Sequence, residues 1–208
     1  MKTYHIIEKY SEIDYGKHIH AFDKIDGSNF RAEWDRKLSK KSRFTMGFKK
    51  FGTRNEIISK NNPFVEAVGI FENKYAEDLD QIFKDNKTFR GIDRITVYGE
   101  FYGMNSFAGI HDWKESHDVV MFDLFLYKKG FLSPVEFIKI FSKFDIPIVR
   151  YKGLLTEDYI ESVKESNLNE GIVYKGVENG KVFMGKIKTN EWLEKVKEKL
   201  GIEEMLKY

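Results

Sequence analysis

A short stretch of the chain places an amine, a carboxylate, a glycine and an amide within six residues. It reads Lys24-Ile25-Asp26-Gly27-Ser28-Asn29-Phe30. A lysine held beside apolar walls and other cations loses proton affinity and becomes a usable amine nucleophile. The chemistry expected of Lys24 is therefore covalent attack on an electrophile. The alternative is an ordinary hairpin turn with an exposed lysine, and this stretch by itself leaves both open.

The residues on both sides of this stretch alternate between polar and apolar side chains. Residues 17–22 and 30–34 each have the pattern of a strand. Asp26-Gly27 would then be a tight connection, in which glycine tolerates a positive φ. We expect Lys24 to leave the end of a strand at the mouth of a pocket.

Strands and helices follow one another in irregular order along the rest of the chain. Further strands are predicted at residues 92–102, 118–127, 146–151, 171–175 and 181–188, the last two joined by an Asn179-Gly180 turn. Helices are predicted after Asn62-Pro63 with a break near Asn73, from Ser133 to Phe144, after Thr156, and over residues 190–207. This order predicts an α+β fold with largely antiparallel sheets and flanking helices, in a single domain over residues 1–208.

The composition limits what the protein can be. The 208 residues are 41% hydrophobic and 15% aromatic, which allows a sizeable core, and the formal net charge is only +2. There is no cysteine, which excludes disulfides and thiolate metal sites. The first ten residues lack the apolar core of a signal peptide, and no apolar run is long enough to span a membrane. We expect a monomeric cytoplasmic protein without a membrane partner, for which a phage or viral origin is one option.

Positive charge is concentrated between Asp35 and Lys60. The basic residues of this band are Arg36, Lys37, Lys40, Lys41, Arg43, Lys49, Lys50, Arg54 and Lys60, against the acidic Asp35 and Glu56. Such a band suits a phosphate backbone. A solvated hairpin face would have the same composition, so both interpretations stay open.

Four further segments each place a charged or aromatic group on a predicted strand or at its end. They carry Glu100, Phe122, Glu170, and the pair Lys186 and Lys188. The two lysines share one strand face, because side chains repeat every second residue. The alternatives are core packing for Phe122, surface salt bridges for the carboxylates and an exposed strand face for the lysines.

In order and rough spacing these segments resemble the motifs of the covalent nucleotidyltransferase superfamily, which contains polynucleotide ligases and mRNA-capping enzymes. The stretch beginning at Lys24 looks like that family's motif I, KxDGxNF. Glu100 falls in motif III, Phe122-Asp123 in IIIa, Glu170-Gly171 in IV and Lys186-Ile187-Lys188 in V. The resemblance is closest to the RNA ligases grouped with the second RNA ligase of phage T4.

The resemblance implies a nucleotidyltransferase domain of the ATP-grasp-like ligase adenylation type and an ATP-dependent RNA ligase. Lys24 would attack the α-phosphate of ATP and form a lysyl-adenylate. The adenylate would pass to a 5′-phosphate, and a 3′-hydroxyl would then displace AMP. Lys186 and Lys188 would act on the charge of the α-phosphate and depress the pKa of Lys24. The implied partner is RNA, as a nicked duplex or as free ends.

The resemblance also implies groups that hold the nucleotide and its metal. The nucleotide-binding candidates are Asp23, Asn29, Arg54, Glu100, Phe122 and Glu170. Phe122 would stack on adenine. Asp26, Glu100 and Glu170 are candidates for the outer shell of Mg²⁺, with Mn²⁺ as the alternative metal. Arg54 resembles the family's conserved arginine after motif I, and Arg43 is the competing assignment.

Two features bear on the subgroup. Asn29-Phe30 points toward RNA ligase, because DNA ligases and capping enzymes usually carry arginine at the position of Asn29. One helix is predicted after Lys188. At this point DNA ligases and capping enzymes continue into an OB-fold domain, and the phage-type RNA ligases continue into a smaller helical domain. We expect neither domain here. The alternatives that stay open are a DNA ligase, a capping guanylyltransferase-like enzyme, and a nucleic-acid-binding module with an inactive ligase-like site.

Overall fold

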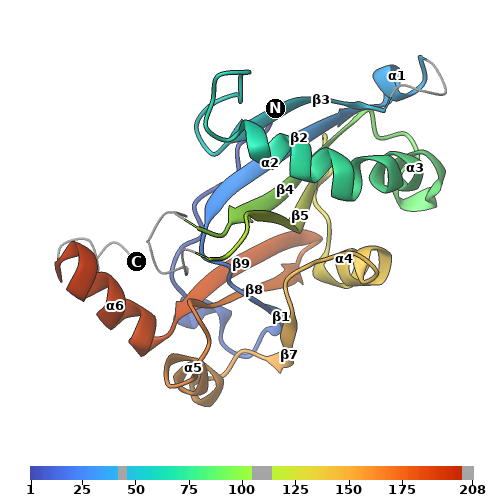
Figure 1. The fold of residues 1–208 in the computed structure, drawn as a ribbon. Coiled ribbons are helices and arrows are strands. Elements are labelled where there is room, and N and C mark those ends of the chain that lie inside the picture. Colours follow the sequence, from blue (N-terminus) through green and yellow to red (C-terminus); the bar gives the residue numbers. More distant parts are fainter. Residues whose placement is uncertain (42–45, 105–113, 203–208) are drawn as a thin grey trace. The chain divides into compact units, whose positions relative to one another are not determined.

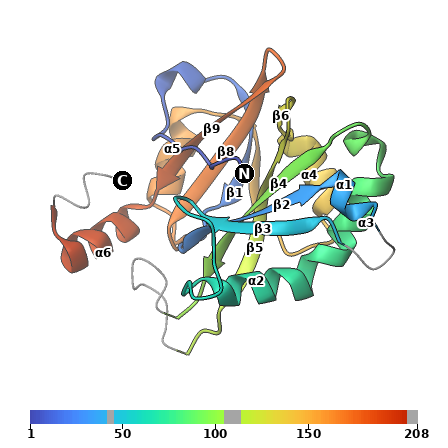
Figure 2. The same cartoon turned by 90° about the horizontal axis from the view of Figure 1, so that it is seen from above.

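The computed structural model describes residues 1–41, 46–104 and 114–202. It contains two antiparallel sheets with flanking helices (Figure 1, Figure 2), so the predicted α+β class is confirmed. The chain divides into two compact units. Unit 1 comprises Met1–Tyr4, Gly27–Leu132 and Ile140–Ile146, and unit 2 comprises His5–Asp26, Ser133–Lys139 and Pro147–Tyr208. The single domain expected over residues 1–208 stays a prediction.

Unit 1 is built on a five-stranded sheet. Its strands, in spatial order, are β3 (Phe48–Thr53), β2 (Ser28–Asp35), β4 (Arg94–Tyr102), β5 (Asp118–Leu126) and β6 (Gly130–Phe131). Helices α2 (Val65–Phe71) and α3 (Glu77–Asp85) lie along one face of this sheet (Figure 1). Phe30 packs against Phe71 of α2 with ring centroids 5.4 Å apart, and Trp34 packs edge-on against Phe83 of α3 at 5.4 Å. These aromatic contacts form the core between sheet and helices.

The predicted break near Asn73 is a change of helix type. Between α2 and α3 the chain forms the π-helical segment η2 (Glu72–Ala76). Helix α2 begins at Val65 and not at Pro63. Asn62 Oδ1 still accepts from the Phe64 amide at 2.9 Å, the contact expected of a capping residue, and the Val65 amide donates to the Asn62 carbonyl oxygen at 3.0 Å in a turn that precedes the helix. Two short helices, α1 (Arg36–Ser39) and η3 (Lys87–Phe89), complete unit 1, and neither was predicted.

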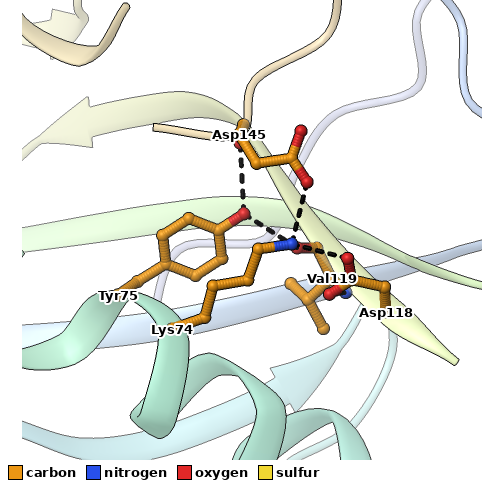
Figure 3. Close-up of polar contacts among 5 residues, drawn as sticks. All are labelled: Lys74, Tyr75, Asp118, Val119 and Asp145. Atoms are coloured by element: carbon orange, nitrogen blue, oxygen red, sulfur yellow. Dashed lines mark hydrogen bonds and ion pairs between the residues drawn. The ribbon is translucent and has the colours of Figure 1, made fainter. Parts of the chain in front are cut away.

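A polar cluster anchors η2 to the start of β5 (Figure 3). Lys74 Nζ lies 2.6 Å from Asp118 Oδ2 and 2.8 Å from Asp145 Oδ2. The Tyr75 hydroxyl lies 2.8 Å from the carbonyl oxygen of Val119 and 3.1 Å from that of Asp145. The cluster therefore joins three chain segments of unit 1 and fixes the strand that carries Phe122.

Unit 2 is built on a four-stranded sheet. The strand order is β7 (Val149–Leu154), β1 (His18–Asp23), β8 (Gly171–Glu178) and β9 (Lys181–Lys188). Ile19 and Ala21 of β1 pack in one apolar cluster with Ile160 and Val163 of helix α5 (Glu157–Lys164). The predicted Asn179-Gly180 hairpin is confirmed, with φ of +50° and +73° at the two turn residues.

The helices that flank unit 2 follow their predicted caps. In α4 (Pro134–Phe141), which begins in unit 2 and ends in unit 1, Ser133 Oγ accepts from the Glu136 amide at 3.2 Å and donates to its carboxylate. At the start of α5, Thr156 Oγ1 accepts from the Tyr159 amide at 3.2 Å. Helix α6 (Asn190–Leu200) begins where predicted and ends before Gly201, at a φ of +92°, and residues 203–208 lie outside the described part. A 3₁₀ turn, η1 (Glu12–Asp14), precedes β1. Within the described ranges no helix is long and apolar enough to cross a membrane.

The connection between β1 and β2 is not a hairpin. β1 pairs with β7 and β8, whereas β2 pairs with β3 and β4, so the chain changes sheet between Asp23 and Ser28. Gly27 does not have the positive φ expected of it. A Cβ at Gly27 would lie 2.4 Å from the carbonyl oxygen of Phe101 on β4. Glycine is therefore required here by close approach of a neighbouring strand.

Candidate active site

In unit 2 the carboxylate of Glu170 binds two of the predicted catalytic lysines. Lys24 Nζ lies 2.7 Å from Glu170 Oε2, and Lys188 Nζ is bonded to Glu170 Oε1. The side chains of Lys188 and Glu170 are only 5% and 4% exposed, whereas that of Lys24 is 24% exposed. The structure thus brings together residues from motifs I, IV and V and leaves the first lysine accessible.

Strand pairing accounts for this meeting. β1 ends at Asp23, and the amide of Lys24 then donates to the carbonyl oxygen of Gly171 at 2.9 Å. Gly171 pairs in register with Lys188 of β9. Gly171 has a φ of +133°, and a Cβ there would lie 2.1 Å from the carbonyl oxygen of Ile187. Glycine after Glu170 is therefore needed for β8 to begin so close to β9.

Positive charge exceeds negative charge in this cluster. Burial, and then the charge of Lys24, lowers the pKa of Lys188 from 10.5 to about 7, although Glu170 opposes the shift. Burial and Lys24 also lower the pKa of Lys186. The ammonium group of Lys188 lies 3.7 Å from the centroid of the Trp192 ring, a cation–π contact that offsets part of its desolvation. A cluster of this kind is suited to an anionic ligand.

Asp23, expected to bind the nucleotide, forms a two-pronged ion pair with Arg150. Arg150 Nε lies 2.5 Å from Asp23 Oδ1, and Nη2 lies 2.7 Å from Oδ2. The β1–β7 register passes from Ala21–Tyr151 to Phe22–Val149, so Arg150 is the extra residue of a β-bulge. Bulges re-aim side chains. Arg150 is not predicted from the sequence, because no local signal marks a bulge of this type.

Asp26 lies in the connection that follows Lys24 and is 9% exposed. The alternative considered for Asp26 was a surface salt bridge, and a side chain this buried does not fit that alternative. In the part of the chain that the structure describes, no three histidine or acidic side chains form a group that could hold a metal. Among these described residues the predicted metal-binding carboxylates therefore do not form an all-protein cage, and their role at a metal stays a prediction.

Unit 1 carries the other predicted nucleotide-binding residues. Asn29 of β2 and Glu100 of β4 stand directly opposite each other in the antiparallel register. The Asn29 side chain is buried, and its Oδ1 atom accepts no hydrogen bond from any described residue. A buried acceptor of this kind calls for an explanation, and a donor on a bound ligand supplies one.

Phe122 occupies a second bulge. The β4–β5 register passes from Tyr98–Asp123 to Gly99–Met121, which makes Phe122 the extra residue on β5. Its ring is half-buried and meets Tyr4 edge-on, with centroids 5.1 Å apart. The adenine-stacking role of Phe122 stays a prediction. Tyr4, whose hydroxyl donates to Asp123 at 3.0 Å, was not singled out from the sequence.

Arg54 lies exposed in the bend after β3, next to Thr53, which pairs with Phe30 of β2. Its rival, Arg43, lies outside the described residues. In the basic band, Lys40, Lys41, Lys49 and Lys50 are exposed, and Lys50 Nζ lies 3.5 Å from Glu33.

Comparisons with known proteins bear on the family and the fold. The family model for RNA ligase matches residues 17–188. A Naegleria gruberi RNA ligase with PPi has 19% sequence identity and a TM-score of 0.64, covering 90% of this chain and 54% of that chain. A variant of that ligase with ATP and Mn has 18% identity and a TM-score of 0.62, covering 89% of this chain and 53% of that one. A comparison with curated protein sequences finds no match.

The likeness to the Naegleria structures shows the fold, and this chain spans about half the length of those proteins. The family match runs from just before β1 to the last residue of β9 and includes every motif considered above. This chain therefore belongs to the RNA ligase family.

Proposed function

We propose that the protein is an ATP-dependent RNA ligase that joins 3′-hydroxyl and 5′-phosphate ends through a lysyl-AMP intermediate on Lys24. The observation that carries the proposal is the cluster at Glu170, where the partly exposed Lys24 and the buried Lys188 share one carboxylate and the half-buried Lys186 adds a further positive charge. An excess of cations favours the neutral, nucleophilic form of an amine and also binds phosphate.

Each step forms one bond to phosphorus and breaks another. The Lys24 amine loses a proton to water in the first step and regains one in the second, and the 3′-hydroxyl loses a proton to water in the third. Lys24 Nζ forms a bond to the α-phosphorus of ATP, and the bond from that phosphorus to the pyrophosphate oxygen breaks. An oxygen of the RNA 5′-phosphate then bonds to the same phosphorus while its bond to Nζ breaks, which returns the lysine. Finally the 3′-oxygen of the other RNA end bonds to the 5′-phosphorus, and AMP leaves. Lys186 and Lys188 stabilise the charge on the α-phosphate, a role in which preorganised cations are effective.

The remaining roles extend the family resemblance to this chain. Asn29 and Glu100 would bind the ribose or base through hydrogen bonds, Phe122 would stack on adenine, and Arg54 would contact the ribose or phosphate. Asp23, held by Arg150, would border the base. Asp26, Glu100 and Glu170 would orient the water shell of Mg²⁺ or Mn²⁺, which supplies charge neutralisation for the phosphates. The basic band would contact the RNA backbone.

The test is the intact mass of the protein after incubation with ATP or with GTP and Mg²⁺. We expect an AMP adduct in the wild type and none in Lys24→Ala or Lys24→Arg, since a guanidinium stays protonated. Lys17→Ala is the matched control, because Lys17 is 21% exposed and also binds carboxylates, Asp14 and Glu178, at 3.0 and 3.1 Å. A GMP adduct would favour a capping enzyme, and no adduct in the wild type would favour a binding module.

A second assay separates RNA ligase from DNA ligase. Four nicked duplexes differ only in the sugars that flank the nick, and sealing is measured at saturating ATP and Mg²⁺. We expect faster sealing when the 3′-hydroxyl strand ends in ribonucleotides, because a protein can sense the 2′-hydroxyl and A-form shape. Equal rates on all four duplexes would contradict the RNA-ligase assignment and leave the nucleotidyltransferase chemistry intact.

A further inference from the structure

Unit 1 contains a cavity that none of the motif residues lines. Its volume is about 390 Å³, within the range of pockets that hold small ligands. The lining residues are Met1, Lys2, Glu33, Arg94, Thr96, Phe125, Tyr127 and Lys128. They come from β2, β4, β5, the turn after β5 and the first residues of the chain.

The cavity opens on the same sheet face as Asn29 and Glu100, farther along the strands. Asn29 and Glu33 share that face because side chains alternate along β2, and Thr96 stands opposite Glu33. Four residues along a strand correspond to about 14 Å. Tyr4 packs on Tyr98, with ring centroids 4.7 Å apart, on the strand between the two places. The cavity is therefore distinct from the predicted nucleotide-binding residues of unit 1.

Aromatic rings and cations converge on this cavity. The Arg94 guanidinium lies 4.1 Å from the centroid of the Tyr127 ring, and Lys128 Nζ lies 5.5 Å from the same centroid. Lys2 Nζ lies 5.7 Å from the centroid of Phe125. The acidic lining residue, Glu33, is already engaged by Lys50 at 3.5 Å. A ligand in the cavity would therefore meet aromatic rings on which it could stack, with positively charged side chains beside them.

The backbone at Lys128 supports a binding role. Lys128 has a φ of +67°, in the left-handed region that glycine or asparagine occupies at lower cost. Strained residues of this kind cluster at ligand sites. Here the strain places an ammonium group at the cavity, whereas the next residue of the same turn, Lys129, does not line it.

We propose that this cavity binds one unpaired nucleotide of the RNA substrate, with the base stacked on the Tyr127–Arg94 pair and a phosphate held by Lys2 and Lys128. Basic grooves with aromatic platforms bind single-stranded nucleic acid in this way. The proposal deepens the proposed function and rests on it. It predicts that the ligase holds the RNA strand at a point about 14 Å from the Asn29–Glu100 pair.

The experiment measures the affinity of the full chain for a fluorescently labelled single-stranded RNA by anisotropy, over a series of salt concentrations. Tyr127→Ala should weaken binding about tenfold, the usual loss for one stacked base. Lys128→Gly should lower the slope of log affinity against log salt by about 0.7, one phosphate contact on a single strand. The charge-matched control, Lys129→Ala, should leave that slope unchanged.

Thermal unfolding of each variant keeps the test decisive. Lys128→Gly should be at least as stable as the wild type, because glycine relieves the left-handed strain, so weaker binding could not come from misfolding. Equal affinity and salt slope in Lys128→Gly and Lys129→Ala would overturn the proposal. AMP-adduct formation by the wild type tests the proposed function separately, since no RNA takes part in that step.

Discussion

Two lysine–carboxylate clusters of this protein differ in which charge is in excess. In unit 1 one lysine, Lys74, lies between two carboxylates, Asp118 at 2.6 Å and Asp145 at 2.8 Å (Figure 3). In unit 2 one carboxylate, Glu170, binds two lysines, and a third lysine adds to the positive charge. The same residue types are present in inverse proportion.

The proportion decides what each cluster can do. Burial lowers the pKa of Lys74, but its hydrogen bonds to Asp118 and Asp145 outweigh burial and raise the pKa above the ordinary value. Burial and neighbouring lysines lower the pKa of Lys188 to about 7. The first cluster has an excess of negative charge, which keeps its lysine protonated, and it holds chain segments together. The second is left with surplus positive charge, which a phosphate can neutralise. A lysine–carboxylate cluster is therefore expected to bind an anion only where the lysines outnumber the carboxylates.

The largest expected effect is on the rate of adenylation. Lys188→Met keeps the length of the side chain beside Trp192 and removes the charge, so adenylation should fall about 10²- to 10³-fold. Lys74→Met should change the rate by less than about threefold at a temperature where the variant is folded. The reason is that Lys74 contributes to the free energy of unfolding and not to the adenylation reaction. The rates are followed by mass spectrometry of the AMP adduct. Similar losses in both variants would remove the functional distinction between the clusters.

The pH dependence of stability should also distinguish the two lysines. The pKa of Lys188 is about 7 in the folded protein and near 10.5 in the unfolded chain. Between these values the unfolded chain holds a proton that the folded protein has released, so stability rises with pH. Below pH 7 the full cost of the buried charge is present.

Relative to Lys188→Met, the wild type should therefore gain up to about 1.4 kcal/mol per pH unit above pH 7. Urea unfolding of both proteins between pH 6.5 and 9.5 measures the difference, since groups that do not interact with Lys188 cancel and Lys24, Lys186 and Glu170 contribute through their coupling to it. A difference that is independent of pH would show that Lys188 does not titrate in this window.

Breaking the cluster around Lys74 should have a smaller effect than the changes at Lys188. The loss in free energy of unfolding should also not depend on pH. Lys74→Met should lower the free energy of unfolding by about 1–3 kcal/mol, the usual value for hydrogen bonds to charged groups. The raised pKa of Lys74 means that its stabilisation is complete below the ordinary lysine pKa and is lost only as pH rises through the raised value. Urea unfolding at pH 7 and pH 9 should give the same loss. A loss that shrinks at pH 9 would count against the direction of this shift.

The smallest expected effect concerns the neutral member of that cluster. Tyr75→Phe removes the hydroxyl that lies 2.8 Å from the carbonyl oxygen of Val119 and should cost about 0.5–1.5 kcal/mol in urea unfolding. Because Lys74 still reaches that carbonyl at 3.2 Å, the cost should stay below that of Lys74→Met. A larger cost for Tyr75→Phe would make the hydroxyl, and not the charge, the main anchor of β5.

The sequence by itself determined the local features of the fold. The cap at Ser133 and Glu136, the cap at Thr156 and the Asn179-Gly180 turn are confirmed, because each depends on residues within four positions of one another. The order of the motifs pointed to the right family for a related reason, since chemistry restricts the residue types allowed at each. Asn62-Pro63 was less informative about the exact boundary, because a turn closed by the Val65 amide and the Asn62 carbonyl oxygen precedes the helix, which starts at Val65.

Only the tertiary structure decided which of these residues lie together and which protonation state each of them favours. Lys24 and Glu170 are 146 residues apart and meet because β1 pairs with β8, and Lys188 joins them because β8 pairs with β9. Arg150 and Phe122 are placed by bulges, which depend on the register of two strands and have no signature within one. The lowered pKa of Lys188 and the raised pKa of Lys74 follow from burial and from neighbours distant in sequence. Electrostatic interactions act through space, so a lysine's neighbours in the fold, and not those in the chain, set its charge.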